Sequence, residues 1–475
     1  MSDEEGKVNM DLDTRIDSYK DEIILQIQNL VRIKSVEGPA EEGKPFGKGP
    51  AEALSYLLKA GEKLGFSTKN LDGYAGHIEY GGGEEIVGAL VHVDVVPEGD
   101  GWTRPPYSAA LEDGKIYGRG SYDDKGACIA VLYALKVLKD AGFQPKKTIR
   151  IIIGANEETG MKCIPHYLSR EPEPDIAFSP DAPFPVVYGE KGILELSFKM
   201  KWKKRKTEDG CLISMDGGKA AKMVPAHCTA DFQLDSADKD RVIELLKGLQ
   251  GDFGTSCRYD EDTKVLSVTL LGKEAYGTEP HKGKNAVAGM MSFLGKVDCI
   301  DAAFRSFVNE YNRTIGESWD GAGLGCDFED DISTPLTFNV GTVHYDSEGF
   351  EMKAHIRYPI RTKYEEILGA IRSNFHCRGV SIETDRLSES HLVGKDSFLV
   401  ETLMDIYRRA TGDAEAEPIT MVGGTYARTL TNAVAFGPLF PGEKQLAHSP
   451  DEYLNIASII KAAKIYAEAL YTLSR

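Results

Sequence analysis

The sequence lacks long apolar runs, basic tracts and a signal-like N-terminus. No apolar stretch approaches the roughly 20 residues that a membrane-spanning helix needs, so no membrane partner is expected. Lys and Arg number 56 against 74 Asp and Glu, which gives a formal charge of −18. This charge disfavours nucleic acid as a partner. Because no basic segment leads into an apolar one at the start, no signal peptide is predicted.

Paired cysteine motifs are also missing. The eight cysteines are scattered, and none forms a C-x-x-C pair. This pattern is typical of small buried residues in a reduced, cytoplasmic protein. We therefore expect a cytoplasmic protein with reduced cysteines and no Cys-rich zinc site.

The chain is long enough for more than one hydrophobic core. It has 475 residues, of which 41% are hydrophobic and 27% are charged. These proportions are those of a globular protein, and the length predicts two or three domains.

Residues 86–94 organise the rest of the chain. They read IVGALVHVD, and the run of Val and Leu predicts a strand buried on both faces. His92 and Asp94 at its end point to the same side because they are two residues apart. A metal-bound His often donates its other ring N–H to a carboxylate, so Asp94 could orient His92 or be a ligand itself. The alternative is a strand-end His bonded to nearby backbone.

Three further strand-like segments also end in candidate metal ligands. They are 148–155 with Glu157 and Glu158, 175–180 with Asp181, and 433–440 with His448. In an open parallel α/β sheet, sites form outside the carboxyl ends of the strands, so these side chains should meet. A mixed set of His and carboxylates without Cys suits zinc, manganese or cobalt. For the two Glu, a solvated helix start is the alternative.

Residues 118–126, GRGSYDDKG, place Asp123 and Asp124 at the start of a predicted helix over 125–141. The glycine spacing does not fit a dinucleotide-binding loop. Capping of the helix N-terminus is the alternative reading of these carboxylates, and it accounts for one Asp better than for two.

Five motifs in chain order resemble those of a known family. They are His92-Val-Asp94, 118–126, Asn156-Glu-Glu-Thr-Gly160, Ser179-Pro-Asp-Ala182 and His448-Ser-Pro-Asp-Glu452. The chain resembles metallopeptidases of the aminoacylase and carboxypeptidase family that carry two co-catalytic metal ions. The similarity is strongest to the bacterial dipeptidase V, carnosinase-like type, and it spans nearly the whole chain.

The resemblance implies a role for each motif residue. One ion is held by His92 and Asp181, the other by Glu158 and His448, and Asp123 bridges both. The peptide bond after Asp123 is expected to be cis, and Asp94 is expected to orient His92. Glu157 acts as general base and acid toward a water that bridges the ions. Zinc is the expected ion, with manganese and cobalt as alternatives.

The resemblance also implies the domain organisation. Residues 1–191 and 387–475 form an α/β catalytic domain with a mostly parallel central sheet, and 192–386 form an inserted α+β lid. A strand–helix–strand order recurs in the lid, over 223–271 and 349–384, which suggests duplicated, ferredoxin-like halves. In proteins of this type, the duplicated lid replaces the contact between two subunits, so that a monomer is active. The alternative to duplication is that residues 192–386 form an ordinary α+β domain.

Substrate-binding residues are predicted in the lid and near the C-terminus. By resemblance, Arg357 grips the substrate carboxylate, as its fork geometry suits, and Gly424 offers backbone donors. A structural surface or ion-pair arginine is the alternative reading of Arg357. Two positions depart from the family: Tyr276 stands where a His is usual, and Lys222 where an Asn is usual. Either residue could still contact substrate, or His281 could take over the missing His.

The sequence therefore predicts a metal-dependent dipeptidase that acts on small unblocked dipeptides. One alternative is an N-acyl amino acid deacylase of the same family. Another is a non-catalytic, metal-dependent peptide-binding protein. A serine hydrolase is disfavoured because the sequence shows no G-x-S-x-G motif.

Overall fold

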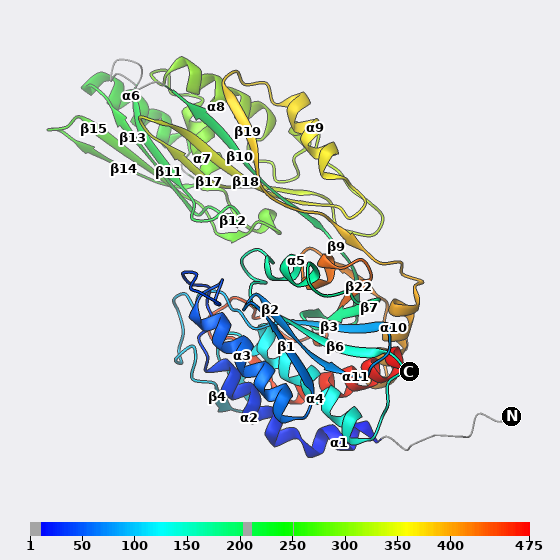
Figure 1. Cartoon of the computed structure of the whole chain (residues 1–475). Helices are drawn as coiled ribbons and strands as arrows, with labels where there is room; N and C mark the ends of the chain where they lie inside the picture. Colours follow the sequence, from blue (N-terminus) through cyan, green and yellow to red (C-terminus); the bar gives the residue numbers. More distant parts are fainter. Residues whose placement is uncertain (1–10, 203–210, 250) are drawn as a thin grey trace. The chain divides into compact units, whose positions relative to one another are not determined.

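A computed structural model describes residues 11–202, 211–249 and 251–475 (Figure 1). The chain divides into two compact units, Met1–Gly189 with Leu392–Arg475, and Glu190–His391. Each unit encloses its own cluster of buried apolar side chains. Among the described residues, every helix is too short or too polar to cross a lipid bilayer. The catalytic and lid roles assigned to residues 1–191, 192–386 and 387–475 stay predictions.

The first unit is built on a mixed sheet whose middle is parallel. In spatial order its strands are β1 (Ser67–Leu71), β2 (Ala75–Tyr80), β6 (Thr148–Gly154), β3 (Ile86–His92), β7 (Ile176–Ser179), β22 (Ala433–Phe436), β9 (Val186–Glu190) and β20 (His391–Leu392). A further strand, β21 (Ile419–Met421), pairs with β9. Neighbours within β6–β3–β7–β22 run parallel, whereas β1, β2 and β9 pair antiparallel. The predicted α/β class with a mostly parallel centre is confirmed.

The register of the central strands explains why their ends meet. His92 of β3 lies opposite Gly154 of β6, and Ala89 of β3 lies opposite Phe178 of β7. Every residue of β3 and β6 is buried, as their apolar runs predict. Because these strands are parallel, the residues that follow them emerge at one edge of the sheet.

Helices cover this sheet. They are α1 (Leu12–Ser18), α2 (Lys20–Val31), α3 (Lys48–Lys63), α4 (Gly126–Asp140), α5 (Cys163–Leu168), α10 (Phe398–Thr411) and α11 (Ile456–Ser474). Helix α4 is buried along nearly its whole length and packs against α11 and β3. Around residue 19 the backbone departs from helical geometry, so α1 and α2 are separate helices.

The second unit contains an antiparallel sheet with helices packed on it. Its strand order is β14 (Gly254–Asp260), β15 (Val265–Leu271), β13 (His227–Gln233), β11 (Leu212–Gly217), β17 (Thr337–Tyr345), β18 (Gly349–Tyr358), β10 (Gly192–Lys201) and β19 (Val380–Ser388). The helices include α6 (Ser236–Lys247), α7 (Ala286–Leu294), α8 (Ala302–Thr314) and α9 (Tyr364–Asn374). A strand leads into a helix and back into the sheet twice, as β13–α6–β14 and as β18–α9–β19.

Side chains alternate across this second sheet. Phe350 of β18 packs against Phe304 and Phe307 of α8, with ring centroids 5.0 and 4.6 Å apart. Even-numbered residues of β18 therefore face the helices. Its odd-numbered residues, which include His355 and Arg357, face the other way.

The structure corrects the expectation that the cysteines are unpaired. Cys211 and Cys299, 88 residues apart in sequence, form a disulfide in the second unit. A backbone hydrogen bond from the Cys211 N–H to the Cys299 carbonyl brings the two residues together. A separation of this length gives no local signal, which is why the sequence did not reveal the pair. Cys128 and Cys163 are buried free thiols, as expected.

Candidate metal centre

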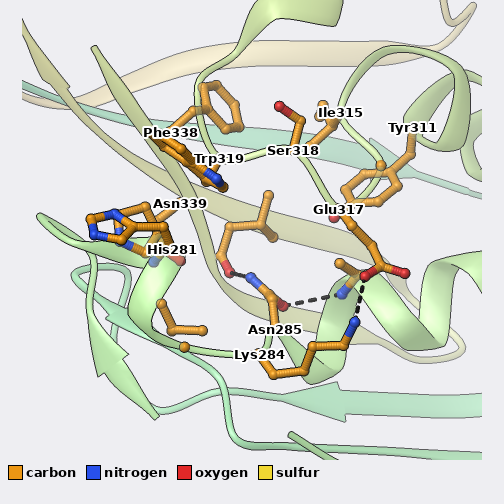
Figure 2. Close-up of a pocket in the computed structure, with 16 residues that line it drawn as sticks. His281, Lys284, Asn285, Tyr311, Ile315, Glu317, Ser318, Trp319, Phe338 and Asn339 are labelled. Carbon is orange, nitrogen blue, oxygen red and sulfur yellow. Dashed lines mark hydrogen bonds and ion pairs between the residues drawn. The ribbon is translucent and has the colours of Figure 1, made fainter. Parts of the chain in front are cut away.

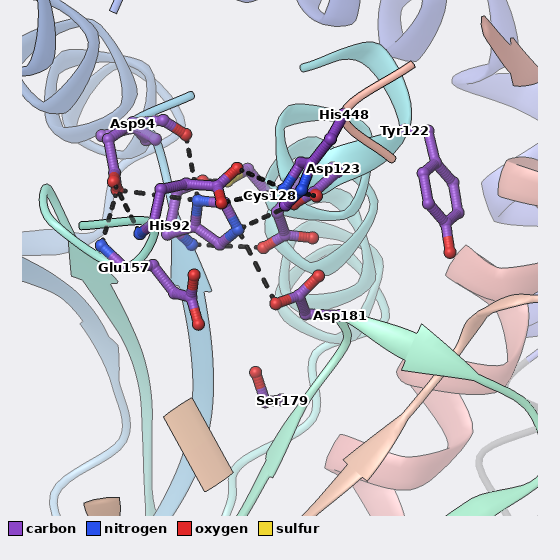
Figure 3. A network of polar contacts seen from close by, with 12 residues as sticks. His92, Asp94, Tyr122, Asp123, Cys128, Glu157, Ser179, Asp181 and His448 are labelled. Carbon is purple, nitrogen blue, oxygen red and sulfur yellow. Dashed lines mark hydrogen bonds and ion pairs between the residues drawn. The ribbon is translucent and has the colours of Figure 1, made fainter. Parts of the chain in front are cut away.

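Side chains from five places in the first unit converge beyond the carboxyl ends of the central strands (Figure 3). They form two groups of potential metal ligands that share one member. The first group is His92, Asp123 and Asp181, and the second is Asp123, Glu158 and His448. Within each group the candidate ligand atoms all lie within 4.8 Å of one another.

The first group joins two strand ends to the turn before α4. Nε2 of His92 lies 3.0 Å from Oδ1 of Asp123 and 3.7 Å from Oδ2 of Asp181. His92 closes β3, and Asp181 follows β7, its parallel neighbour. The sheet register therefore supplies two of the three side chains directly.

The second group depends on a distant loop. Nε2 of His448 lies 2.9 Å from Oε2 of Glu158 and 3.3 Å from Oδ2 of Asp123. His448 has a φ of 64°, in the left-handed region that non-glycine residues seldom adopt. Such a backbone conformation persists where the surrounding structure fixes it, and it is found often at functional sites.

Asp123 belongs to both groups through different oxygens. Oδ1 faces His92 and Oδ2 faces His448. This is the arrangement that a carboxylate bridging two ions requires. The peptide bond between Asp123 and Asp124 is cis, which confirms the expectation from the resemblance.

The carboxylates of the cluster carry more negative charge than the two imidazoles balance. Burial raises the pKa of Glu158 and of Asp181, and the neighbouring charge of Asp123 raises both further. Burial opposes ionisation of Asp123 as well, but hydrogen bonds from both imidazoles bring its pKa below the usual range. Against its burial, the carboxylates raise the pKa of His448 to about 11. A buried site with this charge and this mix of N and O donors fits divalent cations.

Asp94 supports the cluster differently from what the sequence suggested. Its Oδ1 and Oδ2 accept hydrogen bonds from the backbone N–H groups of Glu157 and Glu158, each at 3.0 Å. Nδ1 of His92 lies 3.0 Å from the backbone carbonyl of Asp94 and 3.6 Å from its carboxylate. The backbone carbonyl of Asp94, and not its carboxylate, therefore makes the hydrogen-bond contact with the His92 ring. The carboxylate fixes the turn that carries the two Glu.

Glu157 is a buried carboxyl beside the cluster that belongs to neither ligand group (Figure 3). Burial raises its pKa well above the ordinary value, and the charges of Asp181 and Glu158 act in the same direction. A carboxylate with a raised pKa accepts a proton more readily than an exposed one.

Two supporting residues were not predicted from the sequence. Oε1 of Glu452 accepts hydrogen bonds from the backbone N–H groups of Tyr122 and Asp123, at 3.0 and 3.2 Å. Its Oε2 pairs with Nη1 of Arg119 at 2.6 Å, in a fully buried ion pair. Glu452 therefore holds the turn that presents Asp123. Both residues lie inside motifs noted in the sequence, but their sequence separation of 333 hid the pairing.

Gly424 also belongs to the first unit. It precedes a short 3-10 helix, Tyr426–Thr429, and a side chain at this position would collide with the guanidinium of Arg428. Tyr426 meets the His92 ring edge-on, with centroids 6.2 Å apart. The segment after Gly424 thus reaches the neighbourhood of the cluster, while a role for Gly424 in substrate binding stays a prediction.

The other three predicted substrate residues lie together in the second unit. Met223, next to Lys222, pairs with Tyr276 across two short strands, and the Gly277 N–H donates to the Lys222 carbonyl at 2.7 Å. Thr337 lies opposite Arg357 in the sheet and donates through Oγ1 to the Gly277 carbonyl at 3.4 Å. The fold therefore gathers Lys222, Tyr276 and Arg357 around β17 and β18.

His281 lines a different feature, a cavity of about 210 Å³ in the second unit (Figure 2). Its ring lies 5.3 Å from that of Trp319. Lys284 and Glu317 in the same wall pair with each other at 2.8 Å. Asn285 caps α7 through Oδ1, which accepts from two backbone N–H groups, so this residue of the altered family motif has a structural role.

Known proteins match nearly the whole chain. Residues 88–472 match the model of peptidase family M20/M25/M40. A Bacillus subtilis protein named "Putative dipeptidase YtjP" is 38% identical over 98% of this chain and 100% of its own length. "Putative dipeptidase SH1171" from Staphylococcus haemolyticus is 36% identical over 97% of this chain and 98% of its own length.

Solved structures share the fold at much lower sequence identity. The dipeptidase Dug1p from Saccharomyces cerevisiae aligns with a TM-score of 0.60 and 14% identity, over 98% of both chains. Human carnosine dipeptidase 1 aligns with a TM-score of 0.58 and 15% identity, over 97% of this chain and 98% of that chain. These alignments support the two-unit architecture described above.

Proposed function

The chain belongs to peptidase family M20/M25/M40, and on that premise we propose that it is a metal-dependent dipeptidase acting on small unblocked dipeptides. The relatives named above carry the word dipeptidase in their names, which supports this substrate class. One observation carries the proposal: the two oxygens of Asp123 face two separate His–carboxylate groups.

The five clustered side chains would hold two divalent ions. His92 and Asp181 would bind the first, Glu158 and His448 the second, and Asp123 would bridge them. Zinc fits this donor set, and manganese and cobalt are the alternatives. When bound, the ions would supply a nucleophilic water at neutral pH and polarise the scissile carbonyl.

Glu157 would handle the proton. Its buried carboxyl, with a raised pKa, would take the proton from the attacking water and deliver it to the departing amine. Asp94 contributes by anchoring the backbone of Glu157, so that the base and the ligand Glu158 are fixed as one turn. A dipeptide's terminal carboxylate would be bound by Arg357, with Gly424, Tyr276 and Lys222 as further contacts.

A metal-reconstitution assay tests the proposal. The purified protein is stripped with chelator and reloaded with zinc, manganese or cobalt, and hydrolysis of a dipeptide panel is followed by amine release. We expect activity to disappear on stripping and to return with two equivalents of metal. Full hydrolysis by the stripped protein, or none by the loaded one, would contradict the proposal.

The two departures in the second unit favour a second candidate, an N-acyl amino acid deacylase. Tyr276 and Lys222 replace residues expected of the family, so the part of the substrate that they contact could differ. Parallel assays on N-acetyl and N-succinyl amino acids separate the candidates, because a deacylase would prefer them to free dipeptides. Tight binding of dipeptides without turnover would instead indicate a non-catalytic peptide-binding protein.

We further propose that the protein works as a monomer, because a strand–helix–strand order occurs twice in the second unit, as β13–α6–β14 and as β18–α9–β19. The cytoplasmic location expected from the sequence also stays a proposal, and the Cys211–Cys299 disulfide does not support it. Light scattering coupled to size-exclusion chromatography measures the mass in solution. A dimeric mass in the active fraction would contradict the monomer proposal.

A further inference from the structure

Arg357 takes part in a series of hydrogen bonds on the face of the second sheet that points away from the helices. Its Nε lies 2.9 Å from Nε2 of His355, two residues earlier on β18. Nδ1 of the same imidazole lies 3.1 Å from Oε1 of Glu195 on β10. Glu195 and His355 are direct cross-strand partners in the sheet register.

The chemistry of these groups fixes the direction of each bond. An arginine Nε–H can only donate, so Nε2 of His355 must accept and the imidazole must be neutral. The remaining ring proton then sits on Nδ1 and is donated to the Glu195 carboxylate. Burial lowers the pKa of His355, the hydrogen bond to Glu195 raises it in part, and the positive charge of Arg357 lowers it again. The pKa stays below its ordinary value, which agrees with a neutral ring.

Burial makes this arrangement rigid. The imidazole is 1% exposed, whereas Arg357 is only partly buried. A buried imidazole bonded at both nitrogens cannot rotate without breaking a bond. With Nε fixed to it, the guanidinium plane is fixed as well. A guanidinium offers a carboxylate parallel N–H donors in its own plane, so fixing this plane fixes the direction of such a contact.

A neighbouring residue on the same face holds the segment of another predicted substrate residue, Lys222. Asn339 of β17 lies opposite His355 in the register, and its Nδ2 donates to the carbonyls of Ala221 and Met223 at 2.8 and 2.9 Å. These two carbonyls flank Lys222. One face of paired strands thus anchors both the Lys222 segment and the side chain of Arg357.

We propose that His355, itself oriented by Glu195, is a positioning residue that sets the plane of Arg357 for the terminal carboxylate of the substrate. This inference rests on the proposed function, because it assumes a substrate with a free carboxylate at Arg357. The family resemblance assigns a role to Arg357 but none to His355 or Glu195.

A comparison of dipeptides with their C-terminal amides tests the proposal in the metal-loaded, full-length protein. The measured quantity is the preference ratio, which is kcat/KM for a dipeptide divided by kcat/KM for its amide. Arg357→Ala should reduce this ratio by roughly 30-fold or more, since a charge-assisted bidentate contact is lost. His355→Leu should reduce it about 10-fold, through KM for the dipeptide rather than kcat.

Two further variants separate positioning from a general effect on folding. His355→Gln keeps an acceptor for the Arg357 Nε–H and a donor for Glu195, so it should retain the ratio within about threefold. Lys353→Met is the control: Lys353 precedes His355 by two residues on the same face of β18, and its replacement should leave the preference ratio unchanged. If His355→Leu does not fold, Glu195→Ala provides a second test. Glu195 is partly exposed and forms a hydrogen bond with His355, so its removal should also lower the preference ratio.

The double variant His355→Leu/Arg357→Ala decides the coupling. If His355 acts through Arg357, the double variant should have the same ratio as Arg357→Ala alone. Equal losses on dipeptide and amide in His355→Leu, or fully additive losses in the double variant, would overturn the positioning role while leaving the dipeptidase proposal intact. If Arg357→Ala leaves the ratio unchanged, the substrate assignment fails and the inference falls with it.

Discussion

The two units use opposite ways of assembling polar side chains. In the first unit, His92, Asp123, Glu158, Asp181 and His448 come from separated segments and meet beyond strand ends. In the second unit, Glu195, His355 and Arg357 come from two adjacent strands and share one sheet face. Strand ends bring distant parts of a chain together, whereas a strand face aligns near neighbours across a known register.

Their charge balance also differs. The cluster of the first unit contains more carboxylates than imidazoles, and burial raises the pKa of Glu158 and Asp181. In the second unit, the neutral ring of His355 lies between the acid Glu195 and the base Arg357, and it forms a hydrogen bond with each of them. The first arrangement therefore requires cations to be stable in charged form, while the second sets one acid and one base on either side of a neutral ring.

The largest expected effect comes from removing the shared member of the first cluster. Asp123→Ala should reduce hydrolysis to below about one ten-thousandth and should lower the bound metal from two ions, because both groups lose a ligand. Metal content by mass spectrometry and dipeptide hydrolysis measure this. Asp396→Asn, an exposed carboxylate in the same unit, is the control and should change neither. Normal activity in Asp123→Ala would refute the two-ion interpretation.

Adjacent Glu157 and Glu158 offer a matched pair. Glu157→Gln should lower kcat by about 10²–10⁴ with both ions retained, because it removes only the proton acceptor. Glu158→Gln should lose metal as well as activity, because it belongs to the second ligand group. Metal titration alongside steady-state kinetics distinguishes them. Loss of metal in Glu157→Gln would move Glu157 from the role of base to that of ligand.

The second unit should respond to reductant, whereas the first should not. Closing a loop of 88 residues with the Cys211–Cys299 disulfide should stabilise the folded second unit by about 4 kcal/mol. Thermal melting of the protein with and without reductant, and of Cys211→Ser, measures the effect. Cys257→Ser, an exposed free cysteine in the same unit, should melt like the wild type. Alkylation of both Cys211 and Cys299 in the untreated protein would rule the disulfide out.

The smallest expected effect is on how the stability of the first unit depends on pH. Burial, together with the charge of Arg150, lowers the pKa of His77 in the first unit to about 4 from its ordinary 6.5. Its neutral ring therefore contributes stability above pH 6.5, and this contribution is lost as the pH falls from 6.5 towards 4. Between pH 6.5 and about pH 5 the loss should reach about 1–2 kcal/mol.

Melting temperatures of wild type and His77→Gln between pH 7.5 and pH 5 test this prediction. The wild type should lose more stability on acidification than the variant, because glutamine does not titrate. Parallel curves for the two proteins would show that His77 does not contribute. The His355→Gln variant provides the comparison from the second unit, since the pKa of its buried ring is also lowered.

Sequence patterns were most informative where a residue's position follows from its own segment. The apolar run of β3 predicted a buried strand ending in His92, and the parallel neighbours predicted that Asp181 would emerge beside it. The helix over 125–141 lies within one residue of α4 at each end. In contrast, the apolar spacing over 11–34 is that of one continuous helix, yet the backbone at Tyr19 divides it into α1 and α2, because hydrophobic spacing does not register a local turn.

Sequence patterns were least informative for pairings between distant residues. Neither the Arg119–Glu452 ion pair nor the Cys211–Cys299 disulfide has a local signature. The same holds for the carboxylate of Asp94. It was expected to orient His92, but it accepts hydrogen bonds from the backbone N–H groups of Glu157 and Glu158. These contacts depend on the path of the chain in three dimensions, which spacing along the chain does not encode.

By itself, the sequence determined which side chains this protein has available at its strand ends: imidazoles and carboxylates without cysteine, after strands too apolar to be exposed. Only the tertiary structure decided how they are shared, with one oxygen of Asp123 facing His92 and the other facing His448. The hydrogen bonds that link Glu195 to Arg357 through His355 were likewise visible only in the tertiary structure. The physical reason is that residue type and periodicity fix local conformation, whereas hydrogen-bond partners are chosen by strand register and loop path.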